Sequence, residues 1–146
     1  MTTLVVGATG ATGRLLVEDL LEHGHCLKIV ARSPQSLPAR VRNHEKLTVV
    51  QASILELDDT EMARLVAGCS AVASCLGHNM TFKGLFGPPR RLVTEATRRL
   101  CAAIHANQPE DLVKFVLMNT TANSNRDLVE HRSFRQRLVI GLVRLV

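Results

Sequence analysis

The sequence predicts an α/β fold, a doubly wound parallel sheet of about five strands covered by helices. Two observations indicate this fold. Short apolar runs alternate along the chain with amphipathic stretches of helical period, and the connections between them are short. The first apolar run also leads directly into a turn with three glycines, Gly7, Gly10 and Gly13, which opens a helical stretch. We expect one domain over residues 1–146, because a chain of this length can bury a single core.

The expected strands are short apolar runs rich in β-branched residues. They are Thr3–Val6, Cys26–Ala31, Leu47–Ala52, Ala71–Leu76 and Leu112–Met118. The expected helices are Ala11–His23, a short one near Ala39–Asn43, Asp58–Ala67, Arg90–Ala106 and Glu130–Val146. Gly24 and Gly68 stand where a helix ends with glycine. Pro34 and Pro38 break the chain after the second strand, and residues 77–89 form a loop rich in glycine and proline.

Composition narrows the class of protein. Apolar residues make up 46% of the chain, which excludes a disordered polymer. The four cysteines show neither C-x-x-C nor metal-ligand spacing, so we expect reduced thiols and no metal site. The chain has no basic leader and no apolar run of about 18 residues, which predicts no membrane span and a cytoplasmic protein.

The net charge is +5 and comes mostly from arginine. Arginine binds phosphate bidentately, so this excess suits a phosphorylated cofactor. Nucleic-acid binding is the rival explanation. The basic residues are scattered over several elements, however, and the aromatic side chains that stack on bases are nearly missing. We therefore expect a small-molecule partner and no nucleic acid.

The glycine turn has the chemistry of a dinucleotide site. The first glycine permits a tight turn, the second lets the backbone approach a pyrophosphate, and the third lets the helix pack on the strand. The helix then presents unsatisfied N–H groups and its positive dipole end to the phosphates. Thr9, Ala11 and Thr12 belong to the same turn. The alternative is a glycine-rich turn that binds nothing.

The run Gly7-Ala8-Thr9-Gly10-Ala11-Thr12-Gly13 resembles the cofactor motif of the atypical short-chain dehydrogenases/reductases. That group has a Rossmann-like, NAD(P)-binding fold and includes NmrA-like regulators and small NADPH-dependent flavin or biliverdin reductases. The resemblance extends in order to Ile29-Val30-Ala31-Arg32-Ser33, Ala73-Ser74-Cys75-Leu76-Gly77 and Phe115-Val116-Leu117-Met118-Asn119-Thr120. It implies an NAD(P)-binding protein whose cofactor lies along the carboxyl ends of the strands.

Arg32 predicts which cofactor is bound. An NAD-preferring site carries Asp or Glu at the end of the second strand, about 20 residues after the glycines, to hold the ribose 2′-hydroxyl. This chain has Arg32 there, and a guanidinium binds a 2′-phosphate that a carboxylate would repel. Ser33 adds a hydroxyl donor, and Arg14 begins the first helix, near the same phosphate. We therefore expect NADP(H), the alternative being that Arg14 and Arg32 are solvated surface charges.

The resemblance also bears on the other end of the cofactor. Many relatives hold the adenine with an aspartate after the third strand, where Ser53 is the nearest replacement in this chain. Leu76 and Gly77 follow the fourth strand at the edge where ligands bind, and Gly77 suits a close approach to ribose.

The family's usual Tyr-x-x-x-Lys pair is missing, because the chain has no tyrosine and no lysine after Lys114. The candidate catalytic groups are His78, Asn119 and Thr120, with a structural histidine and strand-end capping as the alternatives. Two functions stay open. One is an NADPH-dependent reductase of a small substrate that works without the Tyr-Lys pair. The other is a non-catalytic NADP(H)-sensing or scaffold protein.

The C-terminal stretch raises the question of a shortened form. Doubly wound dinucleotide folds usually have six or more strands, so we expect a domain that lacks C-terminal strands, as in a truncated product of a longer reductase. The apolar, arginine-studded helix Glu130–Val146 would pack on the sheet, mediate self-association or lie on a membrane surface.

Overall fold

The computed structural model describes residues 1–77 and 92–118. Within them, five strands form one sheet in which every neighbouring pair is parallel. The strands are β1 (Thr2–Val6), β2 (Cys26–Ala31), β3 (Leu47–Gln51), β4 (Ala71–Ser74) and β5 (Lys114–Leu117). Their order across the sheet is β3-β2-β1-β4-β5. The predicted doubly wound parallel sheet is confirmed, since this order reverses direction at β1.

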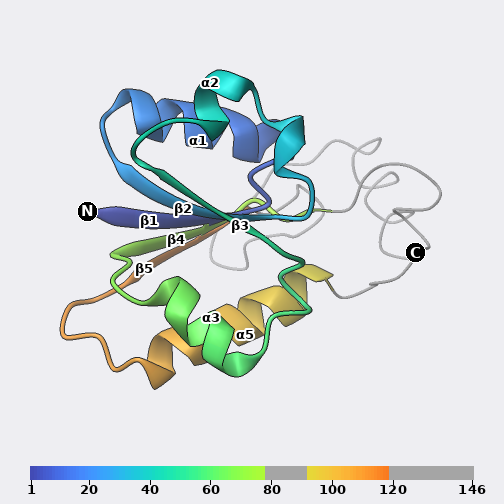
Figure 1. Cartoon of the computed structure of the whole chain (residues 1–146). Coiled ribbons are helices and arrows are strands. Elements are labelled where there is room, and N and C mark those ends of the chain that lie inside the picture. The colour runs from blue at the N-terminus through green and yellow to red at the C-terminus, as the bar shows by residue number, and fades with distance from the viewer. Residues whose placement is uncertain (78–91, 119–146) are drawn as a thin grey trace, which may run out of the picture. The chain divides into compact units, whose positions relative to one another are not determined.

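Helices cover both faces of this sheet. They are α1 (Ala11–Glu22), the 3-10 turn η1 (Pro34–Ser36), α2 (Ala39–Arg42), α3 (Asp59–Val66) and α5 (Leu92–Ala106). Figure 1 shows α1 and α2 on one side of the sheet and α3 and α5 on the other. None of the helices in the described part of the chain is both long and apolar enough to cross a membrane.

Alternation along the strands divides the core in two, because successive side chains point to opposite faces. On β1, Val5 packs on the α1 side, whereas Leu4 and Val6 pack on the side of α3 and α5. The first core consists of Val5, Ala8, Val17, Leu21, Leu27, Ile29, Leu37, Val41 and Ala73. The second consists of Leu4, Val6, Val30, Ile54, Leu57, Met62, Leu65, Val66, Cys69, Val72, Ala96, Leu100 and Ala103. Strands that are apolar on both faces are typical of a parallel sheet.

Local signals set the helix ends. Gly24 and Gly68 follow α1 and α3 with φ of +79° and +69°, the left-handed conformation expected of a glycine after a helix. At the start of α3, the Asp58 carboxylate accepts from the Glu61 N–H at 2.7 Å, and the Glu61 carboxylate accepts from the Asp58 N–H at 2.7 Å. This reciprocal capping box fixes where α3 begins.

Three strands are shorter than predicted, and the smallest difference is in β3, which ends at Gln51 instead of Ala52. β4 ends at Ser74 instead of Leu76. The Cys75 N–H still donates to the Val6 carbonyl at 2.9 Å, but from there the chain crosses over the glycine turn and leaves the sheet. β5 begins at Lys114 instead of Leu112, whose side chain is 88% exposed before the strand starts. The predicted helix at 130–146 and the loop at 78–89 lie outside the described residues.

Candidate nucleotide-binding site

The predicted site residues follow the carboxyl ends of four adjacent strands. Gly7 comes directly after β1, Arg32 directly after β2, Ser53 two residues after β3, and Leu76 and Gly77 shortly after β4. Because all strands are parallel, these positions share one edge of the sheet. The edge includes β1, where the strand order reverses and where doubly wound sheets hold their ligands.

Gly7 brings the first turn against the segment after β4. Its φ is +77°, a conformation that side chains disfavour. A Cβ atom at Gly7 would lie 2.6 Å from the carbonyl carbon and oxygen of Cys75 and 2.8 Å from the Leu76 nitrogen. Only glycine fits between these two backbones. The contact therefore builds the central part of the edge from two segments far apart in the sequence.

Gly10 and Gly13 place α1 against the same turn. A Cβ at Gly13 would lie 2.1 Å from the Gly7 carbonyl oxygen, so the helix backbone packs directly on the turn. Gly10 is the N-cap of α1, and its N–H donates to the Gly7 oxygen at 3.1 Å. Gly10 is exposed, and a Cβ there would meet only that oxygen, at 3.3 Å.

The N-terminus of α1 fits an anion. No side chain caps it, and its first turn carries no acidic residue. The first intrahelical bond runs from the Arg14 N–H to the Gly10 carbonyl at 2.9 Å. The N–H groups of Ala11, Thr12 and Gly13 thus have no acceptor within the helix, and they lie at the positive end of its dipole. Thr9 to Thr12 are all exposed, so a pyrophosphate can reach these donors.

Two arginines stand at this edge with their charges open to solvent. Arg14 is exposed in the first turn of α1, and Arg32 and Ser33 are exposed after β2. The ion pairs formed within residues 1–77 and 92–118 involve neither Arg14 nor Arg32. Within these residues, neither guanidinium is paired with a carboxylate.

The remaining predicted residues differ in exposure. Ser53 is half-buried, and its carbonyl accepts from the Glu56 N–H at 2.9 Å, which closes a turn after β3. Leu76 is half-buried against the α3–α5 core, whereas Gly77 is exposed. The three candidate catalytic residues, His78, Asn119 and Thr120, lie outside the described part of the chain.

Cys75 is the cysteine nearest the glycine turn. Its backbone touches Gly7, and burial raises the pKa of its thiol above the ordinary value. A thiol with a raised pKa stays protonated at neutral pH, and the thiolate is the nucleophilic form. Cys75 therefore packs against the core on the α1 side of the sheet with its thiol protonated at neutral pH.

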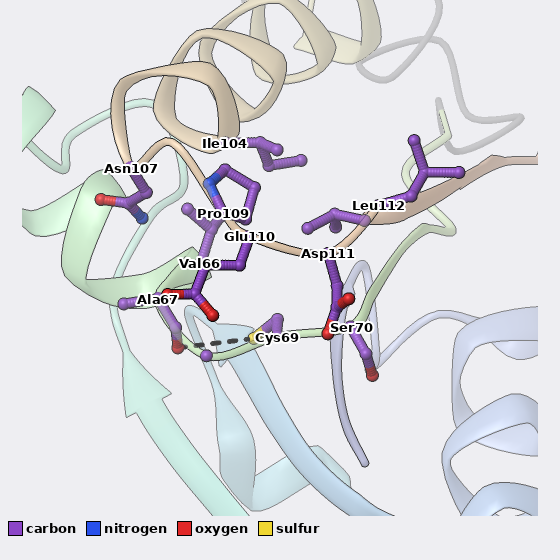
Figure 2. Close-up of a pocket in the computed structure, with 12 residues that line it drawn as sticks. Val66, Ala67, Cys69, Ser70, Ile104, Asn107, Pro109, Glu110, Asp111 and Leu112 are labelled. Carbon is purple, nitrogen blue, oxygen red and sulfur yellow. Dashed lines mark hydrogen bonds between the residues drawn. The ribbon is translucent and has the colours of Figure 1, made fainter.

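A cavity of about 450 Å³ lies elsewhere, at the opposite edge of the sheet. It is lined by the segments before β4 and β5, residues 66–70 and 109–113, together with Ile104 and Asn107. Figure 2 shows the Glu110 and Asp111 carboxylates pointing toward the 66–70 turn. Two carboxylates oppose a phosphate, so the cavity does not suit a dinucleotide.

Arg99 on α5 is the residue that the sequence reasoning did not single out. Its guanidinium reaches the loop between β3 and α3, which contains Ser53. Its position could have been inferred from the helical period. Arg99 is three residues after Ala96 and one before Leu100, both buried, so it lies near the buried face of α5.

Comparison with known proteins agrees with this site. A profile of a family described as NAD(P)H-binding matches residues 7–139, beginning at the first glycine of the turn. The chain belongs to the NAD(P)H-binding family. This match confirms the NAD(P)-binding protein that the resemblance implied, and the parallel sheet agrees with the Rossmann-like fold.

The NAD(P)H-binding chain is also similar to longer proteins. A 3-beta-hydroxysteroid dehydrogenase of Mycolicibacterium neoaurum is 31% identical over 134 residues, which are 86% of this chain and 34% of that protein. A short-chain dehydrogenase/reductase of Veillonella parvula in complex with NADP is 12% identical, with a TM-score of 0.62 over 83% of this chain and 48% of that one. An enzyme of Bordetella bronchiseptica in complex with NAD+ is 19% identical, with a TM-score of 0.57 over 73% and 36%. The chain thus spans one third to one half of the relatives it matches.

Proposed function

We propose that the chain binds NADP(H) along the carboxyl edge of the sheet, with the pyrophosphate at the N-terminus of α1. The observation that carries the choice of NADP(H) is the exposed Arg32 directly after β2, the strand next to β1. Arg32 would hold the 2′-phosphate, with help from Ser33 and Arg14. NAD-preferring sites carry a carboxylate at this position instead.

The energetics favour the phosphorylated cofactor. A hydrogen bond to a charged group contributes about 1.5–3 kcal/mol, which corresponds to roughly 10–150-fold in affinity. NADH lacks the 2′-phosphate and forfeits this contribution. Ser53 would contact the adenine, and Leu76 and Gly77 would line the ribose, since each follows a strand at the same edge.

We further propose that the protein is an NADPH-dependent reductase of a small substrate. NADPH bound at this edge would supply a hydride to the substrate. The proton that accompanies it does not come from a tyrosine of this chain, because the chain has none. His78, Asn119 and Thr120 are the groups that we propose to orient the substrate or carry that proton.

The same lack of tyrosine favours a second candidate, a non-catalytic NADP(H)-sensing or scaffold protein. NADPH oxidation in the presence of carbonyl, quinone and flavin substrates separates the two candidates. Turnover of any of them supports the reductase. Tight NADPH binding without turnover across the panel supports the sensor and contradicts the reductase.

The Arg32→Asp variant tests the cofactor assignment. We expect it to weaken NADPH binding by roughly 10–150-fold or more, because a charge-assisted hydrogen bond is lost and the new carboxylate repels the 2′-phosphate, and not to weaken NADH binding, since a carboxylate there can hold the ribose 2′-hydroxyl. Binding of both cofactors can be followed directly by the fluorescence of the reduced nicotinamide.

The matched control for this test is Arg64→Asp. It makes the same charge change at an exposed position on α3, which covers the face of the sheet opposite α1. We expect it to leave both affinities unchanged. Equal affinities of the wild type for NADPH and NADH, or an equal loss in both variants, would show that Arg32 does not bind the 2′-phosphate.

A further inference from the structure

Arg99 joins α5 to the loop between β3 and α3. Its side chain is 13% exposed. One guanidinium nitrogen donates to the carbonyl oxygens of Ile54 at 3.3 Å and Leu55 at 3.1 Å. The other donates to the Leu57 carbonyl and lies 3.4 Å from an Asp59 carboxylate oxygen. One side chain thus donates to three carbonyl oxygens of the same loop through its planar fork of donors.

The loop depends on this contact for its shape. Ile54 and Leu57 are buried, with exposed fractions of 6% and 9%, so their carbonyls have little access to water. A buried carbonyl without a donor costs free energy, and the guanidinium supplies the donors here. Without Arg99 the loop would have to shift to expose these groups to solvent.

The neighbouring arginine provides a contrast. Arg98 is 67% exposed and pairs with Glu95 on its own helix, at 2.6 Å. Arg98 and Arg99 share a helix, a charge and a size, but only Arg99 is bonded to the loop. The loop contact is therefore a property of one position on α5, not of basic residues on it.

The loop begins beside the proposed 2′-phosphate site. Ala31 pairs with Gln51 in the sheet, and the Ala52 N–H donates to the Ala31 carbonyl at 3.2 Å. Arg32 follows Ala31 and Ser53 follows Ala52, so the two residues leave adjacent strands at the same level. In NADP(H) the 2′-phosphate and the adenine are attached to one ribose. The loop from 52 to 58 thus lies where the adenine end would be.

We propose that Arg99 is a positioning residue that holds the 52–58 loop in the shape that receives the adenine end of NADP(H). The proposal rests on the proposed NADP(H) binding at this edge. Arg99 acts through the loop and touches no part of the cofactor. Without Arg99, a ligand that contacts the loop must also order it on binding. The affinity should therefore fall only for ligands that carry the adenine end.

The test compares Arg99→Met with Arg98→Met as the matched control. We expect Arg99→Met to weaken binding of 2′,5′-ADP, the adenine half of the cofactor, by about tenfold, the factor expected when binding must also order one further residue. The affinity for NADPH should fall by the same factor. Arg98→Met should change neither the affinity for 2′,5′-ADP nor that for NADPH. Titrations are done well below the melting temperature of each variant.

Rescue separates positioning from general stability. In Arg99→Ala, added methylguanidinium should restore 2′,5′-ADP affinity, because it can occupy the vacated space and donate to the same carbonyls. A variant with a lowered melting temperature but wild-type 2′,5′-ADP affinity would overturn the proposal. If wild-type protein binds neither NADPH nor 2′,5′-ADP, the proposed function itself is wrong, which is a different result.

Hydrogen exchange in the wild type keeps the proposal testable if the variants do not fold. We expect 2′,5′-ADP to slow amide exchange in residues 52–58 at least about fivefold, since a bound ligand suppresses local opening. Unchanged exchange in this loop with 2′,5′-ADP bound would overturn the proposal.

Discussion

Replacing Gly7 by alanine should damage the fold at the point where the glycine turn meets the segment after β4. Two effects act together. The residue has φ of +77°, and the new Cβ would lie 2.6 Å from the Cys75 carbonyl carbon and oxygen. Both contacts are to backbone atoms, which cannot rotate away as a flexible side chain would.

The magnitude follows from these two effects. A left-handed conformation costs a non-glycine residue about 1–2 kcal/mol. Overlap in a packed region costs a further 1–3 kcal/mol or so. We therefore expect Gly7→Ala to lower the free energy of unfolding by about 2–5 kcal/mol, which lowers the melting temperature by roughly 5–15 °C for a protein of this size.

Gly68→Ala is the matched control. Gly68 also has a positive φ, +69°, but a Cβ there has nothing within 4 Å. This variant isolates the conformational cost, about 1–2 kcal/mol, partly offset by the reduced entropy of the unfolded chain. Urea unfolding should be followed by far-ultraviolet circular dichroism, because the chain has neither Trp nor Tyr. Equal destabilisation by Gly7→Ala and Gly68→Ala would refute the close-packing argument.

Two further predictions concern stability. Asp58→Ala removes the capping box of α3 and should lower the free energy of unfolding by about 1 kcal/mol, measured as a shift of the urea midpoint; an unchanged midpoint would contradict it. Burial raises the pKa of the Cys69 and Cys75 thiols, so above about pH 8.5 the unfolded chain loses these protons first and stability falls as pH rises. The fall should be shallower when both cysteines are replaced by alanine, and an identical slope would exclude these thiols as its cause.

The types of element could be predicted because their signals are local. Apolar β-branched runs and helical periodicity locate the strands and helices within a few residues. Gly24 and Gly68 mark helix ends through a conformation that glycine adopts easily. The spacing of Asp58 and Glu61 is the sequence pattern of the capping box that begins α3.

Contacts between distant segments could not be predicted in this way. The spacing of the glycines indicates a strand, a turn and a helix, but not that Gly7 packs on Cys75 and Leu76. The contacts of Arg99 with residues more than 40 positions away depend on how α5 lies over the sheet. Such contacts follow from how the elements pack, and local sequence patterns carry no information about that packing.

The candidate site was predictable where its residues lie next to elements with local signals. Arg32 follows β2, is exposed and shares an edge with the glycine turn, as its position in the sequence indicated. Its role toward a 2′-phosphate stays a prediction. The roles of His78, Asn119 and Thr120 stay predictions as well.

A crystal structure of the chain with NADPH would test the central claim most directly. The account predicts the pyrophosphate within about 3 Å of the N–H groups at the start of α1, and the 2′-phosphate within about 4 Å of the Arg32 guanidinium. A cofactor bound away from the glycine turn, or a 2′-phosphate that does not contact Arg32, would contradict it.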